Sequence, residues 1–498
     1  MADTDEKKAE EKKPEGKKEE KPKAFDKLVE SKHSIKVKGK ELKYTVTAGT
    51  MILKEETTDR EKEAEGEKPR AQIFFIAYAR DGVKDKSKRP LTFSFNGGPG
   101  SASVWLHLGV LGPRRVVMQD DGNLPAPPYK LTDNEYSLLD ETDLVFIDPM
   151  NTGYSRPVEG EKPKEWHGFK KDIESVGDFI RLFTTRNNRW LSPKFLIGES
   201  YGTTRASALS GYLQNRFGMY LNGIMLVSVV LDFATVDFNI NNDLPFILFL
   251  PGYTATAWYH NVLTPKRSLA EWLEEAEAFA LGEYASALLK GDALTKEERS
   301  QIAEKVSLYT GISKEFIERS NLRLNDQHFF KELLRTRGLT VGRLDSRFTG
   351  RDRLGITEAP EYDPLLTNIT GPFMAAFYDY IRGELNFETD LPYEILSGFV
   401  HPWSYAEFEN RYVDVAETLR AAMTHNPYLK VFVANGYFDL GTPYFATEYT
   451  FNHLGLDESL RKNISMEYYD AGHMMYIHMP SLKQIKTDLA KFIKSATP

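Results

Sequence analysis

The segment Phe195–Gly202 reads Phe-Leu-Ile-Gly-Glu-Ser-Tyr-Gly, and this stretch decides the fold. Its apolar start indicates a buried strand, and the remainder fits the Gly-x-Ser-x-Gly pattern, in which a sharp strand-to-helix turn exposes a serine hydroxyl. The flanking glycines avoid clashes between neighbouring elements, while the serine is held in a strained conformation. Because Thr203–Arg216 continues with a helical pattern, the sequence predicts Ser200 as a nucleophile at the carboxyl end of a strand.

Buried strands alternate with helical stretches along much of the chain. Segments between about His33 and Tyr78 alternate with period two and predict two or three antiparallel strands. Further apolar runs begin at Leu91, Leu144, Gly223 and Leu429, with helical stretches such as Phe169–Asn187 between them. This alternation indicates a mostly parallel central sheet flanked by helices. Together with the serine turn, it predicts an α/β protein with the α/β-hydrolase fold.

The chain divides into four parts. Residues 1–23 are almost entirely Lys, Glu, Asp, Pro and Ala, so we expect a disordered charged tail. Residues 24–233 and 399–498 are expected to form the two parts of the hydrolase core. Residues 234–398 break the alternation, and the charged helical pattern of Leu263–Leu344 predicts a mainly helical cap over the site. The alternative, an unrelated domain, is disfavoured because a core strand follows the insertion.

A serine hydroxyl is a weak nucleophile without a neighbouring base. His473 lies in Asp-Ala-Gly-His-Met-Met, ahead of a terminal helix predicted for Leu482–Ile493, where this fold places its base. His478 is the nearest alternative, but Pro480 follows it closely and it is expected to open the final helix. His107 follows a glycine-rich loop and is more typical of a packing residue.

The base in turn needs a carboxylate that fixes its tautomer and stabilises the imidazolium. Asp439 follows the apolar run Leu429–Ala434, at the carboxyl end of a predicted strand. The chain order Ser200, Asp439, His473 is that of α/β-hydrolases. Asp232 is the alternative acid, since it also follows a strand, but it comes before the insertion.

The glycine-rich loop Asn96–Gly100 reads Asn-Gly-Gly-Pro-Gly and follows the predicted strand at Leu91. A loop in this place can donate a backbone N–H to an oxyanion, and the second donor is the N–H of Tyr201, the residue after the nucleophile. A phosphate-binding loop is the alternative interpretation, but the Walker pattern with its lysine is missing.

The composition excludes several other kinds of chemistry. The chain has no cysteine, which rules out disulfides, thiolate metal sites and a cysteine nucleophile. Its net charge of −8 disfavours nucleic acid as a main partner. No apolar run reaches the roughly 18 residues that a membrane-spanning helix needs. We expect no metal and no other cofactor, and the pattern indicates no particular oligomeric state.

Taken together, these segments resemble the serine carboxypeptidase family, in the form of a bacterial-type member without cysteines. The matching segments follow the family order: Phe95–Ser101, Leu111–Pro113, Phe146–Pro149, Thr152–Ser155, Gly198–Gly202, Asn435–Asp439 and Gly472–Met474. The resemblance implies a hydrolase that removes C-terminal residues from peptides, often at acidic pH. It implies Ser200, Asp439 and His473 as the catalytic triad and a peptide with a free C-terminus as the partner.

The resemblance also implies roles for the residues around the triad. Gly98 and Tyr201 correspond to the oxyanion donors. Asn96, Gly97 and Glu199 correspond to the residues that bind the terminal carboxylate of the substrate. A glutamic acid can donate a hydrogen bond to that carboxylate only while it is protonated, so such recognition works best at low pH.

The sequence departs from the family pattern at three places. Eukaryotic members carry a second glutamate in a Glu-Leu-Gly-Pro context, where this chain has Val110. Glu199 therefore lacks its usual partner, which bears on the pH profile and on the strictness of carboxypeptidase action. The usual cysteine after the glycine-rich loop is Ser101 here. The pair Arg114–Arg115 can bind a carboxylate, although a surface pair is the favoured interpretation.

Two other functions stay open at this point. Relatives use the same triad as esterases or acyltransferases, and the missing second glutamate keeps this alternative in view. A catalytically silent binding protein on a hydrolase scaffold is disfavoured because all triad positions are filled. Met1–Lys23 lacks the apolar segment of a signal peptide, whereas the family resemblance favours a periplasmic or secreted location, with the cytoplasm as the alternative.

Overall fold

The computed structural model describes residues 25–56 and 66–497. The tail predicted at residues 1–23 lies outside these described residues. The strands of the central sheet are β1 (Lys27–Val37), β2 (Lys40–Glu56), β3 (Glu67–Arg80), β4 (Leu91–Phe95), β7 (Asp143–Ile147), β8 (Arg156–Pro157), β9 (Lys194–Ser200), β10 (Gly223–Val229), β13 (Lys430–Gly436) and β14 (Ile464–Tyr469). Two short hairpins stand apart from this sheet, β5–β6 (Arg114–Val116 with Leu131–Asp133) and β11–β12 (Thr340–Val341 with Thr349–Gly350).

The helices fall into two groups. Those that accompany the sheet are α1 (Val104–Leu106), α2 (Phe169–Arg186), α3 (Tyr201–Phe217), α11 (Ala416–His425), α12 (Tyr444–Asn452), α13 (Glu458–Arg461) and α14 (Met479–Ala496). Those of the insertion are α4 (Leu244–Tyr259), α5 (Leu269–Phe279), α6 (Ala285–Lys290), α7 (Lys296–Thr310), α8 (Lys314–Arg319), α9 (Asp326–Glu332) and α10 (Pro364–Gly383).

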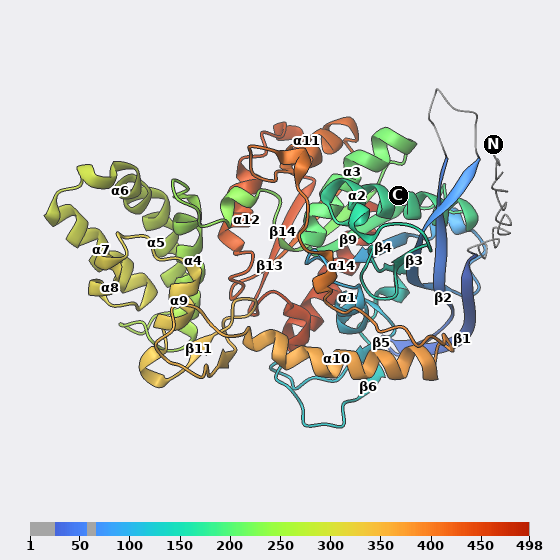
Figure 1. Cartoon of the computed structure of the whole chain (residues 1–498), viewed down its shortest axis with the longest axis horizontal. Helices are drawn as coiled ribbons and strands as arrows, with labels where there is room; N and C mark the ends of the chain where they lie inside the picture. Colours follow the sequence, from blue (N-terminus) through green and yellow to red (C-terminus); the bar gives the residue numbers. More distant parts are fainter. Residues whose placement is uncertain (1–24, 57–65, 498) are drawn as a thin grey trace, which may run out of the picture.

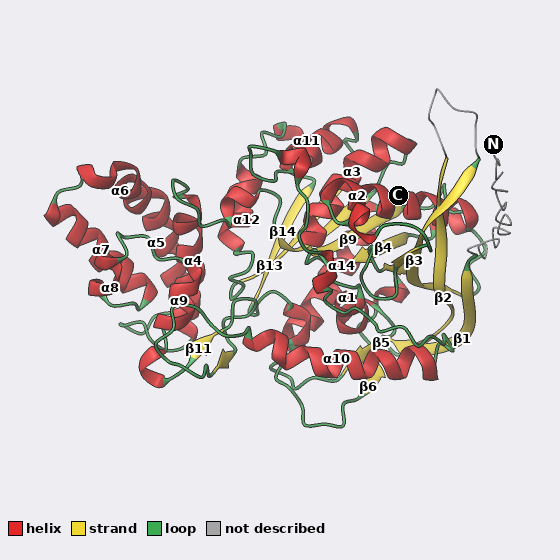
Figure 2. Cartoon of the chain, in the orientation of Figure 1, coloured by secondary structure: helices red, strands yellow, loops and turns green. Residues whose placement is uncertain are grey.

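The sheet of the described chain follows the order β1-β2-β3-β7-β4-β9-β10-β13-β14, with β8 paired to β3. From β7 to β14 all neighbours are parallel, whereas β1, β2 and β3 are antiparallel and β3 joins β7 in antiparallel register. Figure 2 shows the strands in yellow between helices on both faces. This is the α/β-hydrolase architecture that the serine turn and the strand–helix alternation predict.

Each face of the sheet has its own apolar core. On one face the strands pack against α2, α3 and α11, and on the other against α14 and α10. Strands β4, β7 and β10 are buried along their whole length because both faces are covered, which explains their continuous apolar sequences. Parallel strands share one carboxyl edge, so the loops after β4, β9, β13 and β14 meet there.

The insertion has a third apolar core, formed by α4–α9 together with residues of the β13–α12 connection. In Figure 1 helices α5–α8 lie at the left end, far from the label of β9. Of the charged helical stretch expected to cap the site, Leu263–Leu344, only Arg343 and Leu344 line the cavity that contains Ser200. The helices bury their apolar faces against one another instead, and the domain boundaries stay predictions. No helix of residues 25–56 and 66–497 has both the length and the apolar character needed to cross a membrane.

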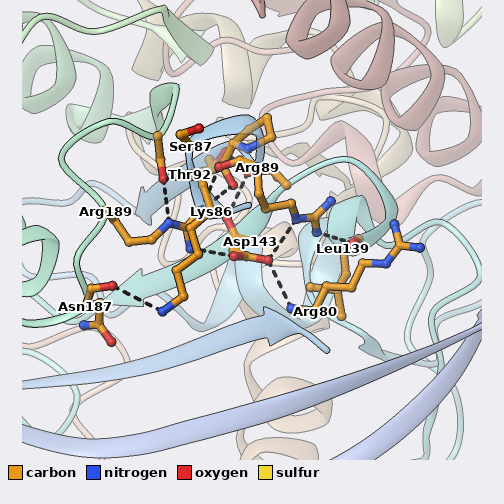
Figure 3. Close-up of polar contacts among 12 residues, drawn as sticks. Arg80, Lys86, Ser87, Arg89, Thr92, Leu139, Asp143, Asn187 and Arg189 are labelled. Carbon is orange, nitrogen blue, oxygen red and sulfur yellow. Dashed lines mark hydrogen bonds and ion pairs between the residues drawn. The ribbon is translucent and has the colours of Figure 1, made fainter. Parts of the chain in front are cut away.

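A buried charge cluster ties the amino ends of three neighbouring strands together (Figure 3). Asp143, the first residue of β7, accepts hydrogen bonds from Arg89 Nε at 3.0 Å and from Arg189 Nη1 at 2.6 Å. Arg89 lies just ahead of β4 and Arg189 just ahead of β9. All these side chains are buried, so the cluster fixes the edge of the sheet opposite the serine turn.

Candidate active site

Ser200 is the last residue of β9 and has a backbone conformation that residues other than glycine rarely adopt. Its φ is 60° and its ψ is −132°, and α3 begins at the next residue. A Cβ atom at Gly198 would lie 2.1 Å from the carbonyl oxygen of Gly202, so this turn closes only with glycine. Strain of this kind costs on the order of 1–3 kcal/mol and is common at functional sites. The turn holds the serine side chain at the carboxyl edge of the sheet.

His473 and Asp439 meet at the same edge, on the loops after β14 and β13. His473 Nδ1 lies 2.7 Å from Asp439 Oδ2. The aspartate is further held by the N–H groups of Gly441 and Thr442, which donate to Oδ1 at 2.8 and 3.0 Å, and by the Thr442 hydroxyl, which donates to Oδ2 at 2.8 Å. The carboxylate is therefore fixed in one orientation and leaves Nε2 of the imidazole as the atom that can exchange a proton.

The surroundings of His473 favour its protonated form. Burial lowers the pKa of His473, but the charge and hydrogen bond of Asp439 outweigh this effect, so the pKa is raised overall. The charge of Glu199 acts in the same direction. A base whose cationic form is stabilised by a buried carboxylate is what proton transfer from a serine hydroxyl requires.

Ser200 and His473 line one cavity of about 430 Å³, a volume typical of small-ligand sites. The core contributes Gly97, Gly98 and Glu199 to its wall, so three of the predicted carboxylate-binding and oxyanion residues lie beside Ser200, whereas Asn96 and Tyr201 do not line the cavity. From the insertion, the wall includes Arg343, Leu366, Ile369 and Leu396.

The oxyanion loop is packed directly against the serine turn. A Cβ atom at Gly97 would lie 2.5 Å from the backbone nitrogen of Tyr201, which shows how closely the two segments approach. As the first residue of α3, Tyr201 has an N–H without an acceptor inside the helix. Gly98 has a φ of +102°, a conformation that favours glycine. The N–H groups of Gly98 and Tyr201 therefore belong to two segments that meet next to Ser200.

Arg205 and Asp172, which were not predicted from the sequence, stabilise the glycine-rich loop through buried hydrogen bonds. Arg205 Nη1 donates to the carbonyl oxygen of Asn96 at 2.6 Å, and its Nε donates to Asp172 Oδ2 at 2.8 Å. Both side chains are completely buried. The available signal was a charge within the small and apolar run Thr203–Leu209, because a buried helix face tolerates an arginine only with a partner.

Glu199 is a buried carboxyl group next to the nucleophile, with 4% of its surface exposed. Asn96 Nδ2 donates a hydrogen bond to Glu199 Oε1 at 2.9 Å, so the Asn96 side chain contacts Glu199 directly. Burial raises the pKa of Glu199 to about 7, even though the charge of His473 lowers it. Near neutral pH a large fraction of this group is therefore an uncharged acid that can donate a hydrogen bond into the cavity.

The residues considered as alternatives for the acid and the base do not line the cavity that contains Ser200. Asp232 caps a short helix by accepting from the N–H of Ala234 at 2.9 Å, and it faces Asp414. His478 precedes α14 and its Nδ1 lies 2.8 Å from the Ser481 hydroxyl. His107 is buried and its Nε2 lies 2.6 Å from the Tyr78 hydroxyl.

The departures from the family pattern have structural roles of their own. Ser101 accepts a hydrogen bond from Trp105 Nε1 at 2.9 Å, and both residues line the cavity. Arg114 pairs with Asp133 and lies 2.6 Å from Glu384, so it bridges a hairpin and the end of α10. Arg114 thus has acidic partners outside the catalytic cavity.

A strained serine at the end of β9, a buried His–Asp pair and paired N–H groups on an α/β-hydrolase sheet define a serine hydrolase. A family model described as serine carboxypeptidase matches residues 64–479, which is most of the chain. The protein belongs to the serine carboxypeptidase family.

Individual relatives agree with this family. A segment of 161 residues is 32% identical to the pheromone-processing carboxypeptidase KEX1 of Saccharomyces cerevisiae, and it covers 31% of this chain and 20% of that protein. The chain thus matches about a fifth of the length of this curated relative. The crystal structure of a prohormone-processing carboxypeptidase from Saccharomyces cerevisiae superposes with a TM-score of 0.52 at 17% identity, covering 91% of both chains, and supports the fold.

Proposed function

We propose that the protein is a serine-type carboxypeptidase, which hydrolyses the last bond of peptides with a free C-terminus through an acyl-enzyme on Ser200. The observation that carries this proposal is Glu199, a buried acid beside the nucleophile whose pKa is raised to about 7. A carboxylate at this position would repel the terminal carboxylate of a peptide. A protonated carboxyl instead donates a hydrogen bond to it, and so selects substrates by their free C-terminus.

The triad accounts for bond cleavage. The Ser200 hydroxyl oxygen attacks the carbonyl carbon of the last peptide bond, while His473 Nε2 takes the hydroxyl proton. The negative charge that develops on the carbonyl oxygen is stabilised by the N–H groups of Gly98 and Tyr201. When the C–N bond breaks, His473 returns the proton to the leaving amine, and the C-terminal amino acid departs.

Water completes the cycle. His473 Nε2 removes a proton from a water molecule, whose oxygen attacks the ester carbon of the acylated Ser200. The shortened peptide then leaves with a new carboxylate, and the proton returns to the serine oxygen. Throughout, Asp439 keeps the Nδ1 proton in place and stabilises the imidazolium.

Mass spectrometry of one peptide tests the proposal. A peptide with a free C-terminus should lose residues one at a time from that end, and the same peptide with a C-terminal amide should be degraded at least tenfold more slowly. Ser200→Ala should abolish both reactions and also labelling by a fluorophosphonate. Equal degradation of acid and amide would favour an esterase or a broader hydrolase, and labelling of the alanine variant would contradict the nucleophile.

A further inference from the structure

Tyr476 is a buried residue that follows Met474, which lines the cavity together with Glu199, by two positions. It lies in the short helix Met475–Ile477, directly after the His473 loop, and only 1% of its surface is exposed. Its ring packs against Gly109, where a Cβ atom would lie 2.4 Å from the ring carbon Cε2. Any other residue at position 109 would displace this ring. Gly109 adjoins Val110, the position at which the sequence lacks a second carboxyl group.

The Tyr476 hydroxyl and Glu199 Oε2 are two buried polar atoms of neighbouring side chains. Glu199 Oε1 is already occupied by the Asn96 amide. Among residues 25–56 and 66–497, neither Oε2 nor the tyrosine hydroxyl completes a hydrogen bond of normal geometry. Met474, two residues before Tyr476, lines the same cavity as Glu199, and each of the two groups shifts the pKa of the other. Buried polar atoms are rarely left without a partner, and catalytic hydrogen bonds often tighten only when substrate binds.

We propose that Tyr476 is a positioning residue for Glu199, whose hydroxyl donates to Oε2 and holds the carboxyl in the orientation that presents its proton to the substrate's terminal carboxylate. The Glu199 side chain is then held from both sides, by Asn96 at Oε1 and by Tyr476 at Oε2. This inference rests on the proposed carboxypeptidase function. It gives Glu199 a phenol as a neighbour in a chain that has Val110 where eukaryotic members of the family have a second glutamate.

The proposal has a consequence for pH because Glu199 titrates. Burial raises the pKa of Glu199, and the charge of Asp439, from the loop after β13, adds to this. The charge of His473, the nearby Tyr476 hydroxyl and the hydrogen bond from Asn96 lower it. Removal of the tyrosine hydroxyl should therefore raise the pKa of Glu199, so that the acid keeps its proton to higher pH.

The test compares Tyr476→Phe with the wild type on a blocked dipeptide with a free C-terminus and on its amide. The variant should raise KM for the free acid about tenfold below pH 6, with kcat changed less than about twofold. For the amide, KM and kcat should each change by less than about twofold. The rise of the free-acid KM at alkaline pH should begin at higher pH than in the wild type. In the Glu199→Gln background, Tyr476→Phe should cause no such shift.

Tyr469→Phe is the matched control, because Tyr469 is equally buried and its hydroxyl donates to Asp488 at 2.9 Å, away from the cavity. Tyr469→Phe should leave KM and kcat for both substrates, and their pH dependence, unchanged. If Tyr476→Phe leaves the free-acid KM and its pH dependence as in the wild type, or slows acid and amide equally, the positioning role is wrong. If the wild type does not hydrolyse the free acid, the proposed function itself fails and this inference with it.

Discussion

His473 Nδ1 lies 2.7 Å from Asp439 Oδ2, although the two residues come from separate loops after neighbouring parallel strands. The same carboxylate also accepts two backbone N–H groups and the Thr442 hydroxyl. Because every direction of the aspartate is occupied, the imidazole has one orientation and one favoured tautomer. The orientation of His473 therefore depends on Asp439, which can be replaced without changing Ser200.

Replacing Asp439 by Asn should lower kcat by about 10³–10⁴-fold, because an amide can donate to Nδ1 and so favour the wrong tautomer of His473. KM should change by less than about threefold, since Asp439 does not line the cavity. Asp232→Asn is the control, because asparagine also caps a helix, and it should retain wild-type kinetics. A large loss in the control, or retained activity in Asp439→Asn, would contradict the assignment of the acid.

Gly97→Ala should damage the oxyanion site, because the new Cβ would lie 2.5 Å from the backbone nitrogen of Tyr201. We expect a loss of about 10²–10³-fold in kcat as that donor is displaced. Steady-state kinetics would measure it, with circular dichroism to verify folding. Gly383→Ala at the end of α10 meets nothing within 4 Å and should leave kcat unchanged. Normal turnover by Gly97→Ala would argue against this pair of donors.

Glu199 should make the protein less stable as pH rises. Its pKa is about 7 in the folded state against an ordinary value of 4.5, so the folded state keeps a proton that the unfolded state loses. The free energy of unfolding should therefore fall between about pH 4.5 and 7, by on the order of 3 kcal/mol from this group.

Glu199→Gln removes this titration, so over the same pH range the free energy of unfolding of the variant should fall by about 3 kcal/mol less than that of the wild type. Urea denaturation at pH 5 and pH 8 measures the difference. Parallel curves for the two proteins would show that Glu199 is not protonated in the folded state.

Asp143→Asn should destabilise the fold by roughly 3–5 kcal/mol, because it leaves Arg89 and Arg189 buried without a counter-charge. The cluster lies at the opposite edge of the sheet, so kcat should be unchanged at temperatures where the variant is folded. Glu283→Gln, which removes the exposed partner of Lys305, should cost less than about 1 kcal/mol. Comparable losses in both variants, measured by denaturant unfolding, would contradict the role given to the cluster.

The positions of the core strands and of the three triad residues could be predicted because each depends on a local pattern. A strand such as β10 is buried on both faces and therefore has a continuous apolar sequence. The edge strand β14 escaped prediction because its residues Ile464–Tyr469 are only partly buried and mix polar with apolar side chains. Its position sets the loop that carries His473.

Contacts between distant segments could not be predicted in this way. The ring of Tyr476 packs on Gly109, and Arg205 donates a hydrogen bond to the carbonyl oxygen of Asn96. Neither contact is marked by a pattern in the neighbouring sequence. The packing of the helices within the insertion could not be predicted for a similar reason. Helical periodicity shows that α5–α8 have apolar faces, but it does not show that these faces pack on one another instead of over the cavity.

The ratio of kcat/KM for a blocked dipeptide with a free C-terminus to that of its amide, measured from pH 4 to pH 9, tests the central claim most directly. In the proposed function Glu199 binds the terminal carboxylate only while protonated, so the ratio should be well above ten at acidic pH and fall through a midpoint near pH 7. Glu199→Gln should remove the midpoint, since glutamine does not titrate. A ratio near one at every pH would contradict recognition of the free C-terminus, and with it the assignment as a carboxypeptidase.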